Sequence, residues 1–378
     1  MTLVFERKLD GVGPRMHAMV LGVGRFSHVK PDRNPERKAC PDSARAMVEF
    51  LMAYQDRFLA PLASIECLLS DPRNDAGKDT LAHLGAHDPR PDDSVDPGTI
   101  AGVRKASNAW LDRGQEGDVY FFYGCSHGVA GRDGGGLFVC EDWGASHNRG
   151  EGLLDVRSIA DEMPSGMKAS GAWVFLDACQ EVITELAEMV GGVDAYRPKS
   201  VGYRKLGSIR SVSLAATPYA GTAFAPDEGV AYFTDVLLQG LKDSFVEPEN
   251  SLWYVTGRQV MTTLDRLFLA LHGRVIEPTT IGLPGFGHRL MPVDTPRVAV
   301  AVDTVPQKLI LDALRVEVCP DRQDEGPVVT RADDELTWRF FLPLDERRLV
   351  VRMQHPPSEH RSQPFHLEPP ATIVKVPK

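Results

Sequence analysis

Apolar runs of strand length alternate with segments of helical periodicity over the first three quarters of the chain. The strand-like runs are apolar on both faces and cover residues 17–24, 64–70, 118–125, 172–178 and 210–216. Helical spacing of apolar positions recurs at residues 42–58, 99–113, 229–242 and 256–272. Because strands that are apolar on both faces need helices on both sides, this pattern predicts an α/β domain with a mostly parallel sheet over residues 1–292.

The character of the chain changes near Met291. Three prolines, Pro292, Pro296 and Pro306, interrupt it, and no clear helical pattern follows. Short strand-like pieces then occupy residues 298–302, 314–318, 336–342, 349–353 and 372–376. Short strands separated by turn residues are typical of a sandwich, so we expect a small all-β domain over residues 298–378.

The composition narrows the classes of function. The chain has 378 residues, of which 43% are hydrophobic, and a formal net charge of −10. This much apolar material can build a core, whereas a negative chain is a poor general binder of phosphate backbones. We therefore expect a folded protein with no nucleic-acid partner.

Targeting segments and disulfides are not expected. The N-terminal sequence MTLVFERKLDG has no basic stretch followed by an apolar run. The apolar runs stay well below the roughly 20 residues that a membrane helix needs. The six cysteines are scattered and form no CxxC pair. We expect a cytoplasmic protein with no membrane association and with reduced thiols, a setting in which a thiol nucleophile persists.

Two of the predicted strands end in reactive side chains. One reads YFFYGCSH and ends at His127, and the other reads VFLDACQE and contains Cys179, 52 residues further along. Ligands of an open α/β sheet bind at the carboxyl ends of parallel strands, so both side chains are expected at one edge. A neighbouring histidine lowers the pKa of a thiol and makes it a nucleophile. The N–H groups of Gly128 and Cys179 are candidate donors to an oxyanion.

These segments, together with others in the same order, resemble the caspase and metacaspase superfamily. The DACQE around Cys179 is similar to the nucleophile motif of that superfamily, with a histidine about 50 residues upstream. MVLGVGRF resembles its first strand, ACPDSARAMVEFL the helix after it, and SVSLAATPYAGTAF with GVAYFTDVLLQGL its small-subunit half. The resemblance covers roughly residues 15–290. It implies a caspase-like sheet and a bacterial cysteine endopeptidase, with Cys179 as nucleophile and His127 as its partner.

An acidic pocket for the substrate is a further expectation. Asp177 lies two residues before Cys179, so on one strand both point to the same face, and a carboxylate there suits a cation. By resemblance to metacaspases, Asp42 in the first helix region is a second acidic residue of this pocket. We therefore expect cleavage of proteins after Arg or Lys. The simpler alternatives are that Asp42 caps its helix and that Asp177 orients a loop.

The basic stretch 195–210 corresponds, by resemblance, to the linker between the two halves of the catalytic domain. A basic-specific peptidase could cut itself there, and Arg204 and Lys205 are better candidates than Arg197, which precedes Pro198. A solvated loop is the simpler interpretation. The resemblance further implies an activated effector in bacterial stress or antiviral defence, with the C-terminal domain sensing a signal or docking an activator.

Neither a cofactor nor a resident metal is predicted. A zinc interpretation would use two cysteine–histidine pairs whose spacing is not a standard one, namely Cys125, His127, Cys140 and His147. Calcium activation, as in metacaspases, stays open, because acidic residues without regular ligand spacing lie near the expected region; these are Asp133, Glu141 and Asp142.

A second class of function also stays open, namely a catalytically silent caspase-like scaffold that binds protein partners. Cys179 is followed by Gln180 and Glu181, where metacaspases have His-Ser-Gly. The intact cysteine–histidine pair favours the enzyme. Replacement of Cys179 separates the two classes, because a scaffold would lose nothing.

Overall fold

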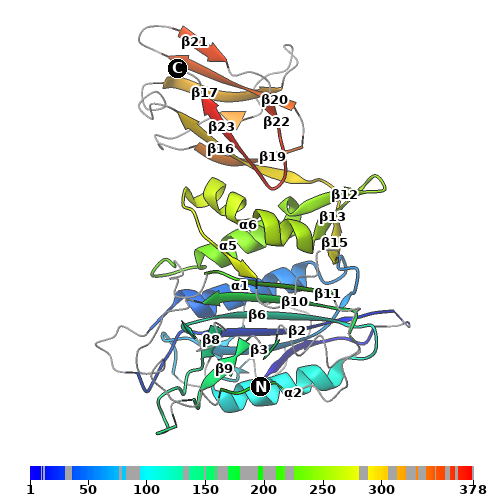
Figure 1. Cartoon of the computed structure of the whole chain (residues 1–378), viewed down its shortest axis with the longest axis vertical. Coiled ribbons are helices and arrows are strands. Elements are labelled where there is room, and N and C mark those ends of the chain that lie inside the picture. Colours follow the sequence, from blue (N-terminus) through cyan, green and yellow to red (C-terminus); the bar gives the residue numbers. More distant parts are fainter. Residues whose placement is uncertain are drawn as a thin grey trace. The chain divides into compact units, whose positions relative to one another are not determined.

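In a computed structural model, the chain forms two compact units (Figure 1). One consists of Met1–Leu238, Thr256–Met261 and Ile276–Met291, and the other of the remaining residues. The structure describes residues 1–9, 11, 13–29, 36–75, 79–81, 94–130, 136–148, 150–156, 158–159, 169–178, 195–198, 210–217, 225–280, 288–304, 313–320, 329–330, 338–344, 346–353, 358–361 and 365–376.

The first unit is built on one mostly parallel sheet. Parallel strands form its centre, and an antiparallel strand closes each edge. Across the sheet the strands are β1 (Leu3–Glu6), β3 (Leu62–Ser70), β2 (Met16–Val23), β6 (Val119–Ser126), β10 (Gly171–Ala178), β11 (Arg210–Ala215) and β14 (Thr279–Thr280). The predicted α/β fold with a mostly parallel sheet is confirmed.

The order of the parallel strands reverses beside β2. The chain runs from β2 to β3, returns to β6 on the other side of β2, and continues outward through β10 and β11. This is a doubly wound order, in which ligands bind beyond the carboxyl ends of the strands. Every residue of β2, β3, β6 and β10 is buried, as expected for strands covered on both faces.

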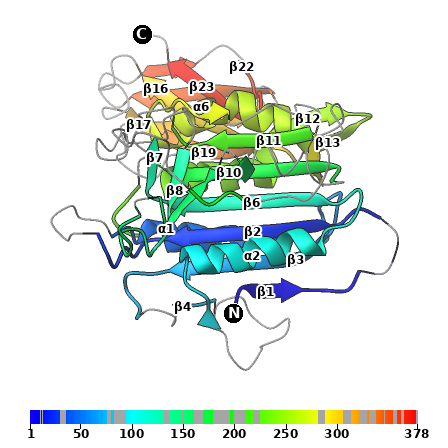
Figure 2. The same ribbon diagram turned by 60° about the horizontal axis from the view of Figure 1, so that its bottom comes forward.

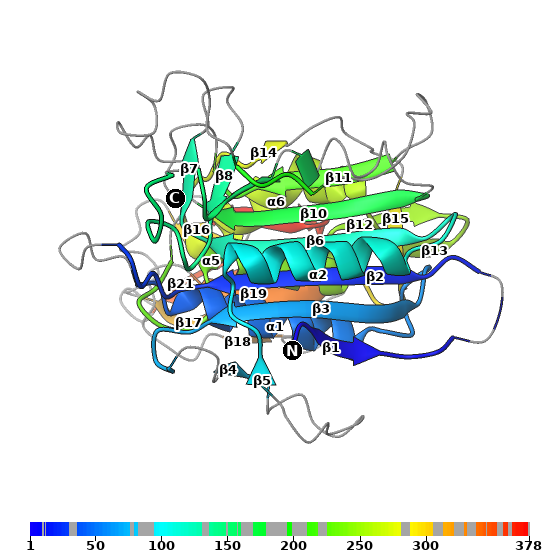
Figure 3. The same ribbon diagram turned by 90° about the horizontal axis from the view of Figure 1, so that it is seen from below.

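Helices cover both faces of this sheet. α1 (Ala39–Ala53) and α2 (Ile100–Arg113) lie on opposite faces, as the view from below shows (Figure 3). α2 buries Val103 and Trp110 in a core that also contains Phe122 of β6. The prediction of helices on both faces is therefore correct.

Local sequence explains where these helices begin. α2 starts as predicted, because the Thr99 hydroxyl accepts a hydrogen bond from the N–H of Gly102. α1 starts at Ala39, earlier than predicted, because Pro41 is tolerated in a first helical turn. Asp42 accordingly lies inside the first turn, and the interpretation of Asp42 as the N-cap is wrong.

β2 and α1 approach each other closely at Gly22. A Cβ on this residue would lie 2.6 Å from the Ala44 Cβ and 2.9 Å from the Cys40 carbonyl oxygen, closer than real Cβ atoms come. Cys125 of β6 is the register partner of Gly22 and so faces the same helix. The missing side chain lets α1 lie over the carboxyl half of the sheet.

The helix α5 (Tyr232–Gln239) lies on the α1 face of the sheet. The N–H of Ala231, just before it, donates to the Ser43 hydroxyl of α1 at 2.9 Å. A π-helical turn, η2 (Gly240–Ser244), follows, and α6 (Gly257–His272) occupies the last segment with predicted helical periodicity. Within the described ranges, no helix has both the length and the apolar character needed to cross a bilayer.

A small antiparallel sheet stands at the carboxyl end of β6 (Figure 2). It comprises β7 (Gly128–Ala130), β8 (Gly136–Val139) and β9 (Leu153–Asp155). A separate ladder joins β4 (Asp79–Thr80) to β5 (Ser94–Val95). The sequence pattern predicts none of these strands, because so few residues show no periodicity.

Three further sheets follow along the chain. One contains β12 (Val246–Glu249), β13 (Leu252–Thr256) and β15 (Arg289–Val293). The second contains β19 (Trp338–Pro343), β16 (Arg297–Thr304) and β23 (Ala371–Val376). The third contains β18 (Val329–Thr330), β17 (Ala313–Pro320), β20 (Glu346–Met353), β21 (Ser358–Arg361) and β22 (Phe365–His366). The strands predicted after residue 298 are present as β16, β17, β19, β20 and β23.

Candidate active site

His127 lies at the one-residue junction between β6 and β7. Its carbonyl accepts a hydrogen bond from the N–H of Val139 at 3.0 Å, and the hydroxyl of Ser126 donates to the Val139 carbonyl at 2.6 Å. Its ring packs on Phe26, with centroids 4.8 Å apart. His127 is half-buried, whereas Phe26, Ser126 and Gly128 are buried. The backbone around His127 is therefore fixed while the residue itself stays partly accessible.

β10 ends beside His127. β6 and β10 pair in parallel and in register along their length, and the last pair joins Ser126 to Ala178. β10 therefore ends at the edge of the sheet where His127 stands. Several predicted site residues lie outside the described residues, namely Cys179, Arg204, Lys205 and Asp133.

Asp177, near the end of β10, is buried and is bound by the helix α5. Its Oδ2 accepts hydrogen bonds from the N–H of Thr234 at 3.2 Å and from the Thr234 hydroxyl at 2.6 Å. Only 3% of the residue is exposed. Burial raises the pKa of the Asp177 carboxyl to about 6, although both bonds from Thr234 favour the charged form. The carboxylate is thus directed at α5 and not at solvent.

Thr234 also contacts β6. The Tyr123 hydroxyl oxygen lies 2.5 Å from Thr234 Oγ1. Because Thr234 donates its one hydroxyl proton to the ionised Asp177, its oxygen must accept from the Tyr123 hydroxyl. The chain of hydrogen bonds Tyr123–Thr234–Asp177 therefore links β6 and β10 to α5. No local motif marks Thr234, which is 57 residues from Asp177.

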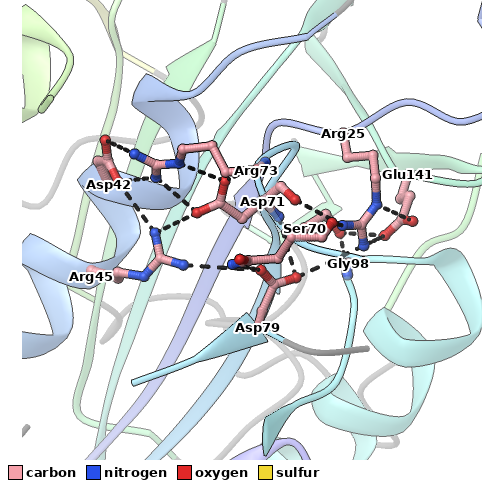
Figure 4. Close-up of polar contacts among 10 residues, drawn as sticks. Arg25, Asp42, Arg45, Ser70, Asp71, Arg73, Asp79, Gly98 and Glu141 are labelled. Atoms are coloured by element: carbon pink, nitrogen blue, oxygen red, sulfur yellow. Dashed lines mark hydrogen bonds and ion pairs between the residues drawn. The ribbon is translucent and has the colours of Figure 1, made fainter. Parts of the chain in front are cut away.

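Asp42 belongs to a network of carboxylates and arginines beside the carboxyl ends of β2 and β3 (Figure 4). It accepts hydrogen bonds from Arg73, the shorter at 2.5 Å, and from Arg45 at 3.2 Å. Its Oδ2 also accepts from the N–H of Gly229 at 3.2 Å. The Arg73 side chain is 38% exposed and that of Asp42 19%. Asp42 thus already holds a guanidinium, the group that it was predicted to bind in a substrate.

Asp71, directly after β3, is the centre of this network. Arg73 donates to it through its backbone N–H, Nε and Nη2, and Arg45 donates at 2.8 Å. Burial disfavours the charge on Asp71, but these bonds outweigh burial and lower its pKa to about 2. The network therefore stays charged at neutral pH and ties α1 to the end of β3.

The described acidic residues considered for calcium have internal partners. Glu141 pairs with Arg25 at 2.9 Å and accepts from the Ser70 hydroxyl, and Asp142 accepts from the N–H of Ile100 at 2.9 Å at the start of α2. Over the part of the chain that the structure describes, no group of three or more His, Cys, Asp or Glu side chains could hold a metal ion. That part includes the zinc alternative, Cys125, His127, Cys140 and His147.

Several other cysteines are buried free thiols, namely Cys40, Cys67, Cys125 and Cys140. Burial raises the pKa of Cys67 to about 12 and those of Cys125 and Cys140 well above the usual range. The thiolate is the reactive form of cysteine, and these environments disfavour it. Cys67, Cys125 and Cys140 are therefore poor competitors of Cys179 for a nucleophilic role.

A polar cluster that no sequence motif predicts lies at the amino ends of the strands. His17 Nδ1 lies 2.8 Å from Ser64 Oγ, and His17 Nε2 lies 3.3 Å from Asp118 Oδ2. This is the order of groups found in a serine-hydrolase triad. However, His17, Ser64 and Asp118 are 5%, 1% and 3% exposed. The cluster is therefore internal, and it lies at the edge of the sheet opposite to the one where ligands bind.

Comparison with known proteins gives distant similarities. No protein-family model matches the chain. The chain is 25% identical over 230 residues to the uncharacterized protein y4kE of Sinorhizobium fredii, covering 55% of this chain and 62% of that protein, which is less than two thirds of its length. Among solved structures, protein GSU0716 from Geobacter sulfurreducens matches with a TM-score of 0.41 and 14% identity over 73% of this chain and 98% of that one. Neither similarity assigns a function.

Proposed function

We propose that the chain is a caspase-like cysteine endopeptidase, with Cys179 as nucleophile and His127 as general base. The observation that carries this proposal is the in-register pairing of β6 with β10, which ends with Ser126 beside Ala178. The next residues of the two segments are His127 and Cys179. A nucleophile and its base have to come within hydrogen-bond reach, and two adjacent strand ends favour that proximity.

Chain geometry limits the separation of the two residues. Neighbouring strands lie about 4.8 Å apart and consecutive Cα atoms about 3.8 Å apart. The Cα atoms of His127 and Cys179 are therefore at most about 12 Å apart, whichever direction the chain takes after Ala178. The distance shortens when both chains continue in the strand direction, which favours contact between imidazole and thiol.

The reaction would be acyl transfer to the thiol. The His127 imidazole takes the proton of Cys179, and the thiolate forms a bond to the scissile carbonyl carbon. The N–H groups of Gly128 and Cys179 are placed in sequence to stabilise the oxyanion. The imidazolium then gives its proton to the leaving amine as the peptide bond breaks, and water hydrolyses the thioester.

Cleavage after Arg or Lys is part of the proposal. Asp42 is the carboxylate proposed for this role, and it binds the Arg73 guanidinium beside the carboxyl ends of the strands. A substrate cation would take the place of Arg73. Asp177 is buried and bound to Thr234, so it would act through its negative charge and not by direct contact. Self-cleavage at Arg204 or Lys205 and a role in bacterial stress or antiviral defence follow as expectations from the resemblance.

The test is peptidase activity of the full chain on fluorogenic peptides that end in Arg, Lys or Asp, with and without calcium. We expect turnover after Arg or Lys that disappears in Cys179→Ala and persists in the control Cys140→Ala, which also replaces a thiol. Mapping of new termini after incubation tests self-cleavage at the same time. Turnover that survives in Cys179→Ala would contradict the assignment of the nucleophile.

The scaffold stays the alternative function. It is favoured by one observation, namely that Arg73 and Arg45 already pair with Asp42, the half-buried carboxylate of the expected pocket. A scaffold predicts no turnover on any peptide and unchanged partner binding in Cys179→Ala. Capture of the same partners by wild type and variant, together with catalytic silence, would favour it over the enzyme.

A further inference from the structure

We propose that Thr234 is a positioning residue for the Cys179–His127 pair, and this inference rests on the proposed function. A single hydroxyl, that of Thr234 in α5, contacts both strands that lead to the pair. It lies 2.6 Å from Asp177 of β10 and 2.5 Å from Tyr123 of β6. This hydroxyl therefore adds a side-chain link to the backbone ladder that already pairs the two strands.

The register of the sheet places these contacts close to the proposed site. Asp177 is two residues before Cys179, and its register partner on β6 is Cys125, which is two residues before His127. Tyr123 points to the same face of β6 as Cys125, since side chains on one face recur every second residue. The Thr234 hydroxyl therefore bridges the two strands, contacting β10 two residues before Cys179 and β6 four residues before His127.

The bridge is rigid because it is buried and because each hydrogen bond has a fixed direction. Thr234 and Tyr123 are both fully buried, and Asp177 is 3% exposed. Asp177 also accepts from the backbone N–H of Thr234, so the first turn of α5 holds its carboxylate at two points. A buried hydrogen bond of this kind has no water to replace it when one partner is removed.

The bridge can matter for catalysis because acyl transfer depends steeply on alignment. A misplacement of about 1 Å remote from the reacting atoms can cost on the order of 10²-fold in rate. Loss of the hydroxyl would remove this side-chain link and leave the backbone ladder alone to hold the ends of β6 and β10. The rate of the chemical step should then fall, whereas binding of substrate by residues elsewhere should not.

The decisive variants are Thr234→Val and Thr234→Ser in the full chain. Valine removes the hydroxyl and keeps the branched shape, and serine keeps the hydroxyl. For Thr234→Val we expect kcat to fall about 10- to 100-fold with KM within about threefold of wild type. For Thr234→Ser we expect both constants within about threefold of wild type. Tyr123→Phe removes one bond of the bridge and should give a smaller loss of kcat.

Alkylation of Cys179 supplies a readout that does not need a peptide substrate. The rate of iodoacetamide modification at Cys179, followed by mass spectrometry across pH, reports the thiolate that pairing with His127 creates. We expect this rate to fall in Thr234→Val, with its pH profile moved toward that of a free thiol, and to be restored in Thr234→Ser. Should Thr234→Val prove unfolded, Tyr123→Phe carries the same test.

The outcomes separate the two proposals. Unchanged kcat and unchanged alkylation in a folded Thr234→Val overturn the role of Thr234 while the peptidase stands. Equal losses in Thr234→Val and Thr234→Ser also overturn it, because they trace the effect to packing and not to the hydroxyl. If the wild type shows neither Cys179-dependent turnover nor accelerated alkylation of Cys179, the proposed function fails, and the positioning role fails with it.

Discussion

The amino ends and the carboxyl ends of the parallel strands in the large sheet carry similar polar groups in opposite settings. We call these two sides of the sheet the amino edge and the carboxyl edge. At the amino edge, His17 lies between Ser64 and Asp118, with all three residues buried. At the carboxyl edge, His127 is half-buried beside the end of β10. The amino edge shows the more complete set of distances, yet the carboxyl edge is the better candidate for chemistry. A triad-like set of distances is therefore insufficient without access for a substrate.

The surroundings explain why the amino edge is structural. The Asp118 carboxylate already accepts hydrogen bonds from the backbone N–H groups of Arg15 and Gln115, at 2.9 Å and 2.7 Å. Burial lowers the pKa of His17, although Asp118 opposes this shift. The buried histidine is bonded through Nδ1 to the Ser64 hydroxyl, whereas its Nε2 makes no hydrogen bond to a described residue, so it serves as an internal contact where three strands begin. His127, in contrast, stands where the chain leaves the sheet.

The largest expected effect is a loss of kcat/KM on substitution at the carboxyl edge, with Ser64→Ala at the amino edge as the comparison. Cys179→Ala and His127→Ala should each lower kcat/KM at least about 10³-fold, because each removes a member of the proposed reacting pair. Ser64→Ala removes the hydroxyl of the amino-edge cluster and should leave kcat/KM unchanged. Rates on an arginyl peptide, corrected for the folded fraction, measure the difference. Loss of turnover in Ser64→Ala would reverse the assignment of the two edges.

The next effect concerns stability at the amino edge. His17→Ala should lower the free energy of unfolding by about 4 kcal/mol, because it opens a cavity and removes the partner of the buried Ser64 hydroxyl. Activity per folded molecule should not change. Urea unfolding and active-site titration check the two parts. A stable His17→Ala with lower turnover would show that the amino edge takes part in catalysis.

Much of the fold was predictable, because it depends on periodicity. The buried strands β2, β3, β6, β10 and β11 follow apolar runs, and α2 begins at a recognisable cap, Thr99. The strand β1 was not predictable, since the four residues of Leu3–Glu6 pair with β3 at an edge and show no period of their own. The start of α1 was not predictable, because the apolar periodicity is recognisable only from residue 42, whereas the helix begins at Ala39.

The candidate site was predictable only where a local motif marks it. His127 stands directly after an apolar strand, so its place at the carboxyl edge follows from the sequence. Thr234 and Arg73 act on Asp177 and Asp42 from 57 and 31 residues away. Neither carries a local signal, because one lies in an amphipathic helix and the other in a polar loop. Their roles depend on tertiary packing.

The third prediction concerns the buried carboxylate of Asp177. Its folded pKa of about 6 lies above the usual 3.8, so its contribution to stability is complete below pH 3.8 and is lost as pH rises through 6. Asp177→Asn stays neutral and keeps an acceptor for Thr234. It should therefore raise the free energy of unfolding at pH 7.5 by up to about 3 kcal/mol and have little effect at pH 4.

Urea unfolding of wild type and Asp177→Asn across this pH range measures the difference. A variant that is more stable at pH 7.5 and less active would show that the ionised Asp177 destabilises the fold but serves activity. The polar groups of the amino edge, in contrast, would serve stability alone. A variant that is less stable at pH 7.5 would mean that the ionised carboxylate is a net favourable partner of Thr234, and the contrast between the edges would weaken.

The smallest effect is expected at Arg73. Arg73→Ala should cost about 1 kcal/mol of stability, because the side chain is partly exposed and Arg45 still binds Asp42 and Asp71. The cost should shrink in about 1 M salt, which screens exposed charges. The control Lys38→Ala breaks the exposed pair with Glu228 and should cost no more.

Arg73→Ala also tests whether Asp42 can bind a substrate cation. Removal of the internal guanidinium leaves the half-buried Asp42 with fewer partners, so KM for an arginyl peptide should fall severalfold while kcat stays near wild type. A peptide with a neutral residue in place of arginine should show no such change. If KM for the arginyl peptide is unchanged or rises, Arg73 and Asp42 form a purely structural pair. The charged groups of the carboxyl edge would then be structural, as those of the amino edge are. Only the ends of β6 and β10 would distinguish the two edges.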